Sequence, residues 1–153
     1  MMTPEEIRAI EIRLGYLFLE QGLLLQALTR KAAAQEQRQK GKQCEDQEVF
    51  RTLGDAVLKA ILTDLLIQKG YTTRGGITQK KEKLEKEESL SAMLRAMEIT
   101  PIVGIGERNI GVHEQSLALA ETFEAIVAAI YKDGGYEIIK NLVVKWFSPL
   151  IEQ

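Results

Sequence analysis

The sequence predicts an all-α protein, a single helical domain over residues 1–153. Apolar residues recur at helical spacing through most of the chain, alternating segments are almost absent, and only three prolines interrupt the pattern. The chain is 45% hydrophobic and 27% charged, which gives enough apolar material for one core. The net charge of −2 does not favour nonspecific nucleic-acid binding through bulk charge.

Three further features indicate a soluble cytoplasmic protein that does not enter a membrane. Cys44 is the only cysteine, so no intrachain disulfide can form. The N-terminus carries acidic residues early and has no apolar core run of a secretory signal. No stretch approaches the ~18 uninterrupted apolar residues of a membrane span.

Caps and breakers divide the chain into its expected elements. Thr3 is an expected N-cap, with Pro4 in the first helical position and Glu6 as the capping-box partner of a helix that ends near Gly15. A second apolar-periodic run covers residues 22–34, and the polar segment after it is expected to be a mobile loop.

A long apolar helix is expected over residues 47–68, closed by Lys69 as a C-terminal cation and by Gly70. The other expected segments are a turn at 72–76, one or two charged helices over 77–99, a glycine-bearing loop at 101–112, a helix over 114–135 and a closing segment over 136–153.

Acidic side chains interrupt the two most apolar of these helices. Glu48, Arg51 and Asp55 fall on one helical stripe, and Glu121 shares a face with Glu124. Two such helices could bring three or four carboxylates around one point. Hard oxygen ligands of this kind suit Mg²⁺, and also Mn²⁺, which bridge to phosphate groups.

Spacing alone leaves other interpretations open. The pairs that Arg51 forms with Glu48 and Asp55 could be surface salt bridges worth only ~0.2–0.5 kcal/mol each, and Glu121 and Glu124 could be solvated. A third alternative is an all-α nucleotide pyrophosphatase that binds Mg²⁺ through ExxE pairs, since Glu85-x-x-Glu88 accompanies Glu121-x-x-Glu124.

Three quoted segments carry a resemblance to a known family. "EVFRTLGDAVL" and "LALAETFEAIVAAIYKDGG" resemble, in the right order, the two signatures of the ribonuclease III catalytic domain, and "LGYLFLEQGLLLQALTRKA" resembles its opening. The likeness runs from about residue 8 to residue 149. Nothing after residue 149 has room for a double-stranded-RNA-binding domain, so we expect a minimal form of the family.

The resemblance implies an all-helical, homodimeric, Mg²⁺-dependent endonuclease that cuts double-stranded RNA to 5′-phosphate and 3′-hydroxyl ends. By position, Asp55 and Glu124 match the family's metal-ligating and catalytic acids. Glu121 stands in place of a metal-binding aspartate, and Glu48 matches the outer glutamate of the first signature.

Three positions depart from the family pattern. Arg51 replaces a glutamate that ligates or supports the metal, Thr52 replaces a phenylalanine that plugs a pocket on the partner subunit, and Arg30 replaces a histidine. These departures make a catalytically degenerate RNA-binding or assembly subunit the alternative function.

Five basic residues are candidates for contacts with the RNA backbone, because duplex RNA is recognised mainly through phosphates and 2′-hydroxyls. They are Arg51, Arg74, Lys80, Lys81 and Arg108.

Overall fold

The computed structural model describes residues 2–152, and within that range the ordered elements are all helical. They are α1 (Pro4–Leu14), α2 (Gln21–Leu28), α3 (Lys31–Gln39), α4 (Glu48–Gln68), α5 (Arg74–Glu85), α6 (Glu87–Ala96), α7 (Ile105–Asn109), the 3-10 turn η1 (Val112–Glu114), α8 (Ser116–Gly134) and α9 (Tyr136–Ile151). The predicted all-α class is confirmed. None of the described helices combines the length and the apolarity needed to cross a bilayer.

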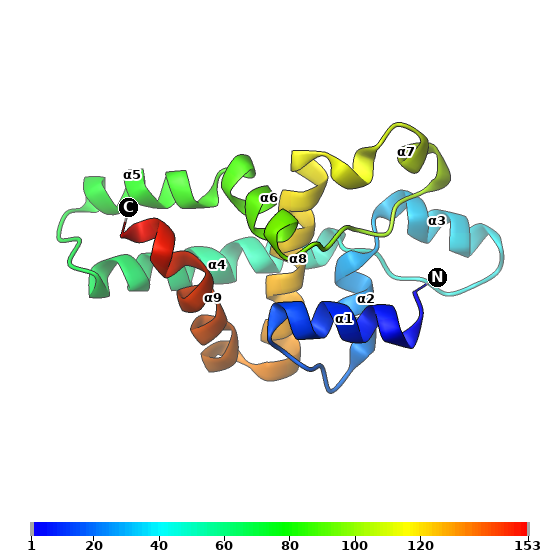
Figure 1. Ribbon diagram of the computed structural model, residues 1–153, viewed down its shortest axis with the longest axis horizontal. Helices are drawn as coiled ribbons and strands as arrows, with labels where there is room; N and C mark the ends of the chain where they lie inside the picture. Colours follow the sequence, from blue (N-terminus) through cyan, green and yellow to red (C-terminus); the bar gives the residue numbers. More distant parts are fainter. Residues whose placement is uncertain (1, 153) are drawn as a thin grey trace.

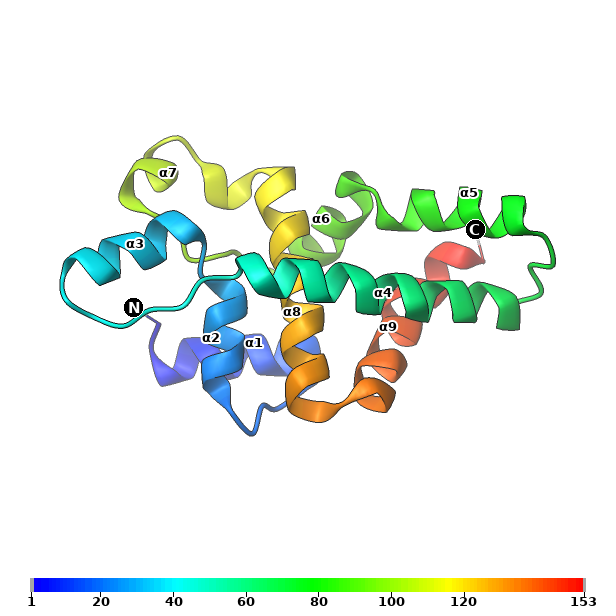
Figure 2. The same cartoon turned by 180° about the vertical axis from the view of Figure 1, so that it is seen from behind.

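Helix α8 forms the centre of the molecule. Its side chains are buried almost without interruption from Ala118 to Ile130, and it packs against α2, α4, α6 and α9. Figures 1 and 2 show that α4 runs along the molecule and crosses the middle of α8. Helix α5 lies beside α4, and α1 and α2 lie near the lower half of α8. A helix that is apolar around most of its surface must lie inside a bundle, which is where α8 lies.

Gly54 allows α4 and α8 to touch. A Cβ atom at this position would lie only 1.7 Å from the backbone oxygen of Glu124, so any side chain would force the helices apart. The absent side chain at Gly54 therefore sets the distance between the residues that follow it on α4 and those around Glu124 on α8.

The ends of several helices follow the expected caps. Thr3 and Glu6 form the predicted capping box at the start of α1, and the left-handed Gly15 (φ +79°) follows its last residue. Lys69 and Gly70 (φ +100°) close α4 as predicted.

The second apolar run is broken where the sequence predicted continuity. The Ile102 N–H donates to the Leu28 carbonyl (2.8 Å) and the Arg30 N–H donates to the Ile102 carbonyl (2.9 Å), which holds Thr29 and Arg30 in an extended conformation between α2 and α3. These hydrogen bonds link segments about seventy residues apart, so local periodicity could not reveal them.

Three smaller boundaries also differ from the prediction. The expected loop at 35–47 is helical as far as Gln39, and the expected turn at 72–76 already contains the first turn of α5, capped by Thr73. The region 77–99 forms two helices, one of the two expected arrangements, and the extended backbone of Lys86 separates α5 from α6. A short helix, α7, lies inside the loop expected at 101–112.

Candidate functional site

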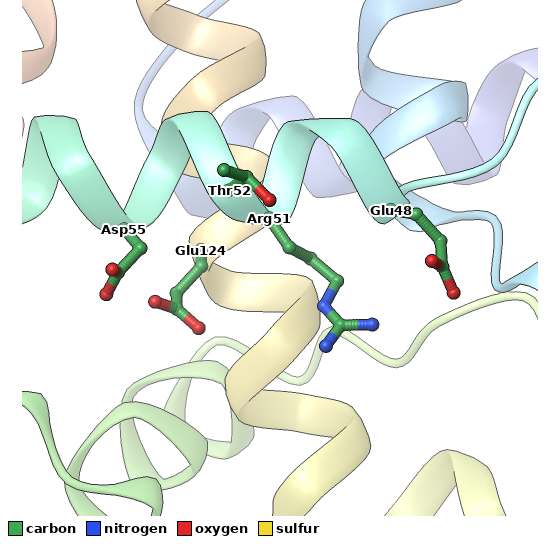
Figure 3. A pocket seen from close by; sticks show the side chains of 5 residues that line it. All are labelled: Glu48, Arg51, Thr52, Asp55 and Glu124. Atoms are coloured by element: carbon green, nitrogen blue, oxygen red, sulfur yellow. The ribbon is translucent and has the colours of Figure 1, made fainter.

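Two carboxylates meet where α4 crosses α8. Asp55 follows Gly54 on α4, and Glu124 lies on α8 at the point that Gly54 touches. Together with Glu48, Arg51 and Thr52 they line an open cavity of about 330 Å³. Figure 3 shows the Asp55 and Glu124 carboxyl groups beside each other at one end of the cavity. The close crossing of the helices thus brings two acidic groups from distant parts of the chain into one polar site.

The two carboxyl groups hold their protons with different strength. Burial and the adjacent Asp55 raise the pKa of Glu124 to about 8, well above its ordinary value of 4.5. Burial also tends to raise the pKa of Asp55, but hydrogen bonds with Lys59 and Glu124 outweigh it and lower that pKa. At neutral pH the pair therefore carries one proton, which belongs mainly to Glu124, and Asp55 carries the negative charge.

This asymmetry predicts a pH dependence of stability. Since the pKa of Glu124 is about 8 in the fold against 4.5 ordinarily, the folded state binds more protons than the unfolded state between those values. The contribution of Glu124 to the free energy of unfolding therefore stabilises the fold at low pH and is lost as the pH rises through about 8. We expect the melting temperature of the metal-free protein to fall over this range, and to fall less steeply in Glu124→Gln than in a Glu48→Gln control. Parallel pH profiles for all three proteins would contradict the assignment.

Glu121 does not join this pair. One of its carboxylate oxygens binds the Arg51 guanidinium, and the other lies 3.1 Å from Nη1 of Arg30. Nε of Arg30 in turn lies 3.2 Å from Oε2 of Glu107 on α7. The Glu121 side chain is only 14% exposed, and two guanidinium groups neutralise it there. The two arginines that depart from the family pattern thus engage the same carboxylate.

Glu48 also lies apart. It is exposed at the start of α4, and in Figure 3 it lies at the far end of the cavity, beyond Arg51. Among residues 2–152, no group of three or more His, Cys, Asp or Glu side chains lies close enough together to hold a metal ion. The structure therefore brings together Asp55 and Glu124, and leaves Glu121 and Glu48 outside the point where three or four carboxylates were expected to converge.

The basic residues predicted to contact RNA differ in their exposure to solvent. Nζ of Lys80 donates to the carbonyl of Leu150 on α9 (3.2 Å), and Nζ of Lys81 lies 3.5 Å from Oγ1 of Thr63 on α4. Both lysines are partly buried, whereas Arg74 at the start of α5 and Arg108 on α7 are exposed.

Sequence reasoning missed the cation on Asp55, which is Lys59. Nζ of Lys59 lies 2.8 Å from Oδ1 of Asp55 and 3.4 Å from Oε2 of Glu85. Lys59 follows Asp55 by four residues on one helix, a spacing that could have indicated this contact. Glu85 comes from α5, and only the packing of α5 on α4 brings it there.

Comparison with known families identifies the fold that holds this site. The family model described as Ribonuclease-III-like matches residues 20–150. The chain belongs to the ribonuclease-III-like family. This confirms the resemblance found in the two acidic signatures.

Named relatives of this ribonuclease-III-like chain match it almost from end to end. Ribonuclease 3 of Bdellovibrio bacteriovorus is 35% identical over 99% of the chain, and Ribonuclease 3 of Pelotomaculum thermopropionicum is 33% identical over 97%. The chain spans 65% and 62% of the length of these two proteins.

The solved nuclease domain of ribonuclease III from Campylobacter jejuni shares the fold. Its TM-score is 0.82 at 26% identity, and the match covers 94% of this chain and 96% of that domain. The ribonuclease-III-like fold thus extends over nearly all of the described residues.

Proposed function

We propose that this chain is the nuclease domain of a metal-dependent endoribonuclease that hydrolyses double-stranded RNA to 5′-phosphate and 3′-hydroxyl ends. The observation that carries the proposal is the Asp55–Glu124 pair, which lies in an open polar cavity at the α4–α8 crossing of a ribonuclease-III-like chain. Metal dependence is general in this family. The names of the relatives support a ribonuclease activity for the longer proteins that contain such a domain.

The two carboxylates present fit one Mg²⁺ ion. Mg²⁺ keeps several waters and is bound in proteins through one or two carboxylates together with substrate phosphates. Asp55 and Glu124 supply that number, whereas Glu121 is engaged by Arg51 and Arg30. Burial first, and then the adjacent Asp55, raise the pKa of Glu124, as expected for a partly buried carboxyl group that faces a second one. We therefore assign Asp55 and Glu124 as the residues that would hold Mg²⁺, with Mn²⁺ as an alternative.

The residues of the chain then have separate tasks. A bound Mg²⁺ would polarise a phosphoryl oxygen and make hydroxide available near neutral pH. Glu124 must release its proton before both carboxylates can ligate, so ion binding is expected to tighten as the pH approaches 8. Arg51 and Arg30 hold Glu121 away from the pair, and the exposed Arg74 and Arg108 are proposed to contact the RNA backbone.

A homodimer is part of this proposal. The structure of the Campylobacter jejuni nuclease domain is described in terms of a region involved in dimer formation, and its fold covers most of this chain. Thr52 is exposed at the mouth of the cavity, so here the contact between subunits would form without a large apolar side chain at this position.

The test is cleavage of a long RNA duplex by the purified chain. We expect cleavage in Mg²⁺, none in EDTA, and none of a DNA duplex of the same sequence, with products that carry 5′-phosphate and 3′-hydroxyl ends. The second candidate function is a noncatalytic RNA-binding subunit, which the two guanidinium groups on Glu121 favour. Duplex binding without cleavage in either Mg²⁺ or Mn²⁺ would establish that alternative and contradict the nuclease.

Arg51→Glu distinguishes a suppressing arginine from a useful one. The change removes a cation beside the Asp55–Glu124 pair and adds a carboxylate, so Mn²⁺ should bind about tenfold more tightly or better. Higher cleavage activity would show that Arg51 suppresses the site, and lower activity would show that it acts on RNA. Arg38→Glu makes the same charge change at the Asp46 ion pair and should leave Mn²⁺ affinity near that of the unaltered protein. Equal affinities of both variants would contradict a site beside Arg51.

A further inference from the structure

Lys59 lies between two carboxylates that come from different helices. Its ammonium is 2.8 Å from Oδ1 of Asp55, one turn earlier on α4, and 3.4 Å from Oε2 of Glu85, the last residue of α5. The Lys59 side chain is 46% exposed and has a flexible four-carbon stem. A small rotation of this stem would exchange the nearer carboxylate for the other.

The Glu85 carboxylate is largely buried and has few hydrogen-bond partners. Its side chain is 13% exposed, and Oε1 is buried without a hydrogen-bond partner among the described residues. A buried carboxylate oxygen without a partner is costly. The Lys59 ammonium lies beside the other oxygen, Oε2, and a closer approach would neutralise this buried carboxylate.

A divalent ion and the Lys59 ammonium would compete for the Asp55 carboxylate. A divalent ion on Asp55 and Glu124 would replace the ammonium at Oδ1 or face its positive charge at short range. A bound ion therefore weakens the hold of Asp55 on Lys59, and Glu85, 3.4 Å from the ammonium, is the carboxylate that can receive it.

We propose that Lys59 is a tethered cation that occupies Asp55 while no divalent ion is bound and transfers to Glu85 when an ion enters. This rests on the proposed function in one respect, that Asp55 and Glu124 form the ion site. Lys59 is then a positioning residue that lowers the affinity of the site for ions, and Glu85 limits that effect by accepting the ammonium.

The test is a Mn²⁺ titration of the whole chain, followed by electron paramagnetic resonance at fixed pH. Lys59→Met keeps most of the side-chain stem and removes the charge, so Mn²⁺ should bind about tenfold more tightly or better. Lys69→Met removes the same charge from the ion pair with Glu152 (2.9 Å) and should change the affinity less than about twofold. Equal affinities of the Lys59 variant and the unaltered protein would overturn the proposal.

Glu85→Gln tests the second half of the proposal. Without the acceptor, the ammonium stays on Asp55, so Mn²⁺ affinity should fall by about threefold or more. In the Lys59→Met background the same change should have less than about a twofold effect, because no ammonium remains to be received. Additive effects of the two substitutions would overturn the transfer to Glu85.

The outcomes also separate this inference from the proposed function. Binding of Mn²⁺ that is lost in Glu124→Gln but unaffected by Lys59→Met would overturn the inference and leave the ion site standing. No Mn²⁺ binding in any of the proteins would overturn both.

Discussion

Glu124→Gln is expected to abolish cleavage of duplex RNA, with a loss of about a thousandfold or more in the single-turnover rate. An ion that stabilises developing charge contributes several kcal/mol to catalysis, and about 4 kcal/mol corresponds to this factor. Glutamine cannot become an anionic ligand, so Asp55 would be left as the only carboxylate at the crossing. Asp55→Asn should have a similar effect for the same reason.

The fold should tolerate Glu124→Gln. In the ion-free protein Glu124 holds its proton at neutral pH, and glutamine has nearly the same shape as the protonated carboxyl group. Loss of activity with an unchanged melting temperature at pH 7 would therefore be a loss of chemistry. Glu48→Gln is the matched control, because Glu48 lies at the far end of the same cavity, apart from the Asp55–Glu124 pair, and its loss should cost far less activity. Cleavage retained by Glu124→Gln would contradict the assigned roles.

Gly54→Ala is expected to destabilise the protein by about 3 kcal/mol or more, the upper range for an overpacked core. The added Cβ would lie 1.7 Å from the Glu124 carbonyl oxygen, and a backbone atom cannot move aside as a flexible side chain can. The helices would have to separate, which would also move Asp55 away from Glu124. Urea unfolding measures the loss of stability, and Mn²⁺ titration measures the loss of the site.

Gly75→Ala provides the comparison for this prediction. Gly75 lies in α5, and a Cβ atom there would have no neighbour within 4 Å. Alanine favours a helix over glycine, so this variant should be about 0.5–1 kcal/mol more stable than the unaltered protein. If Gly54→Ala unfolded at the same urea concentration as the unaltered protein, the close crossing would not be needed.

The long elements could be predicted because their signals are local. The apolar repeat and the Lys69–Gly70 ending defined α4, the apolar run around Phe123 defined α8, and the Thr3–Glu6 capping box defined the start of α1. The break at Thr29 could not be predicted, because it depends on hydrogen bonds with Ile102 far along the chain. Local periodicity describes which side chains share a face and contains no record of such distant partners.

In the site, too, the local features could be predicted from the sequence and the contacts between distant helices could not. The signatures pointed to Asp55 and Glu124, which do meet, and to the unusual Arg51, which contacts Glu121. The second arginine on Glu121 and the carboxylate beyond Lys59 were not foreseen, because each joins helices that are far apart in sequence. Charged side chains are long and flexible, so their partners are decided by packing after the helices are in place.

A crystal structure of the chain with Mn²⁺, located by its anomalous scattering, tests the central claim most directly. We expect one ion per chain, bound by carboxylate oxygens of both Asp55 and Glu124 at about 2.0–2.3 Å, with Glu121 still held by the two arginines. An ion held elsewhere, or no ion on the Asp55–Glu124 pair in saturating Mn²⁺, would contradict it.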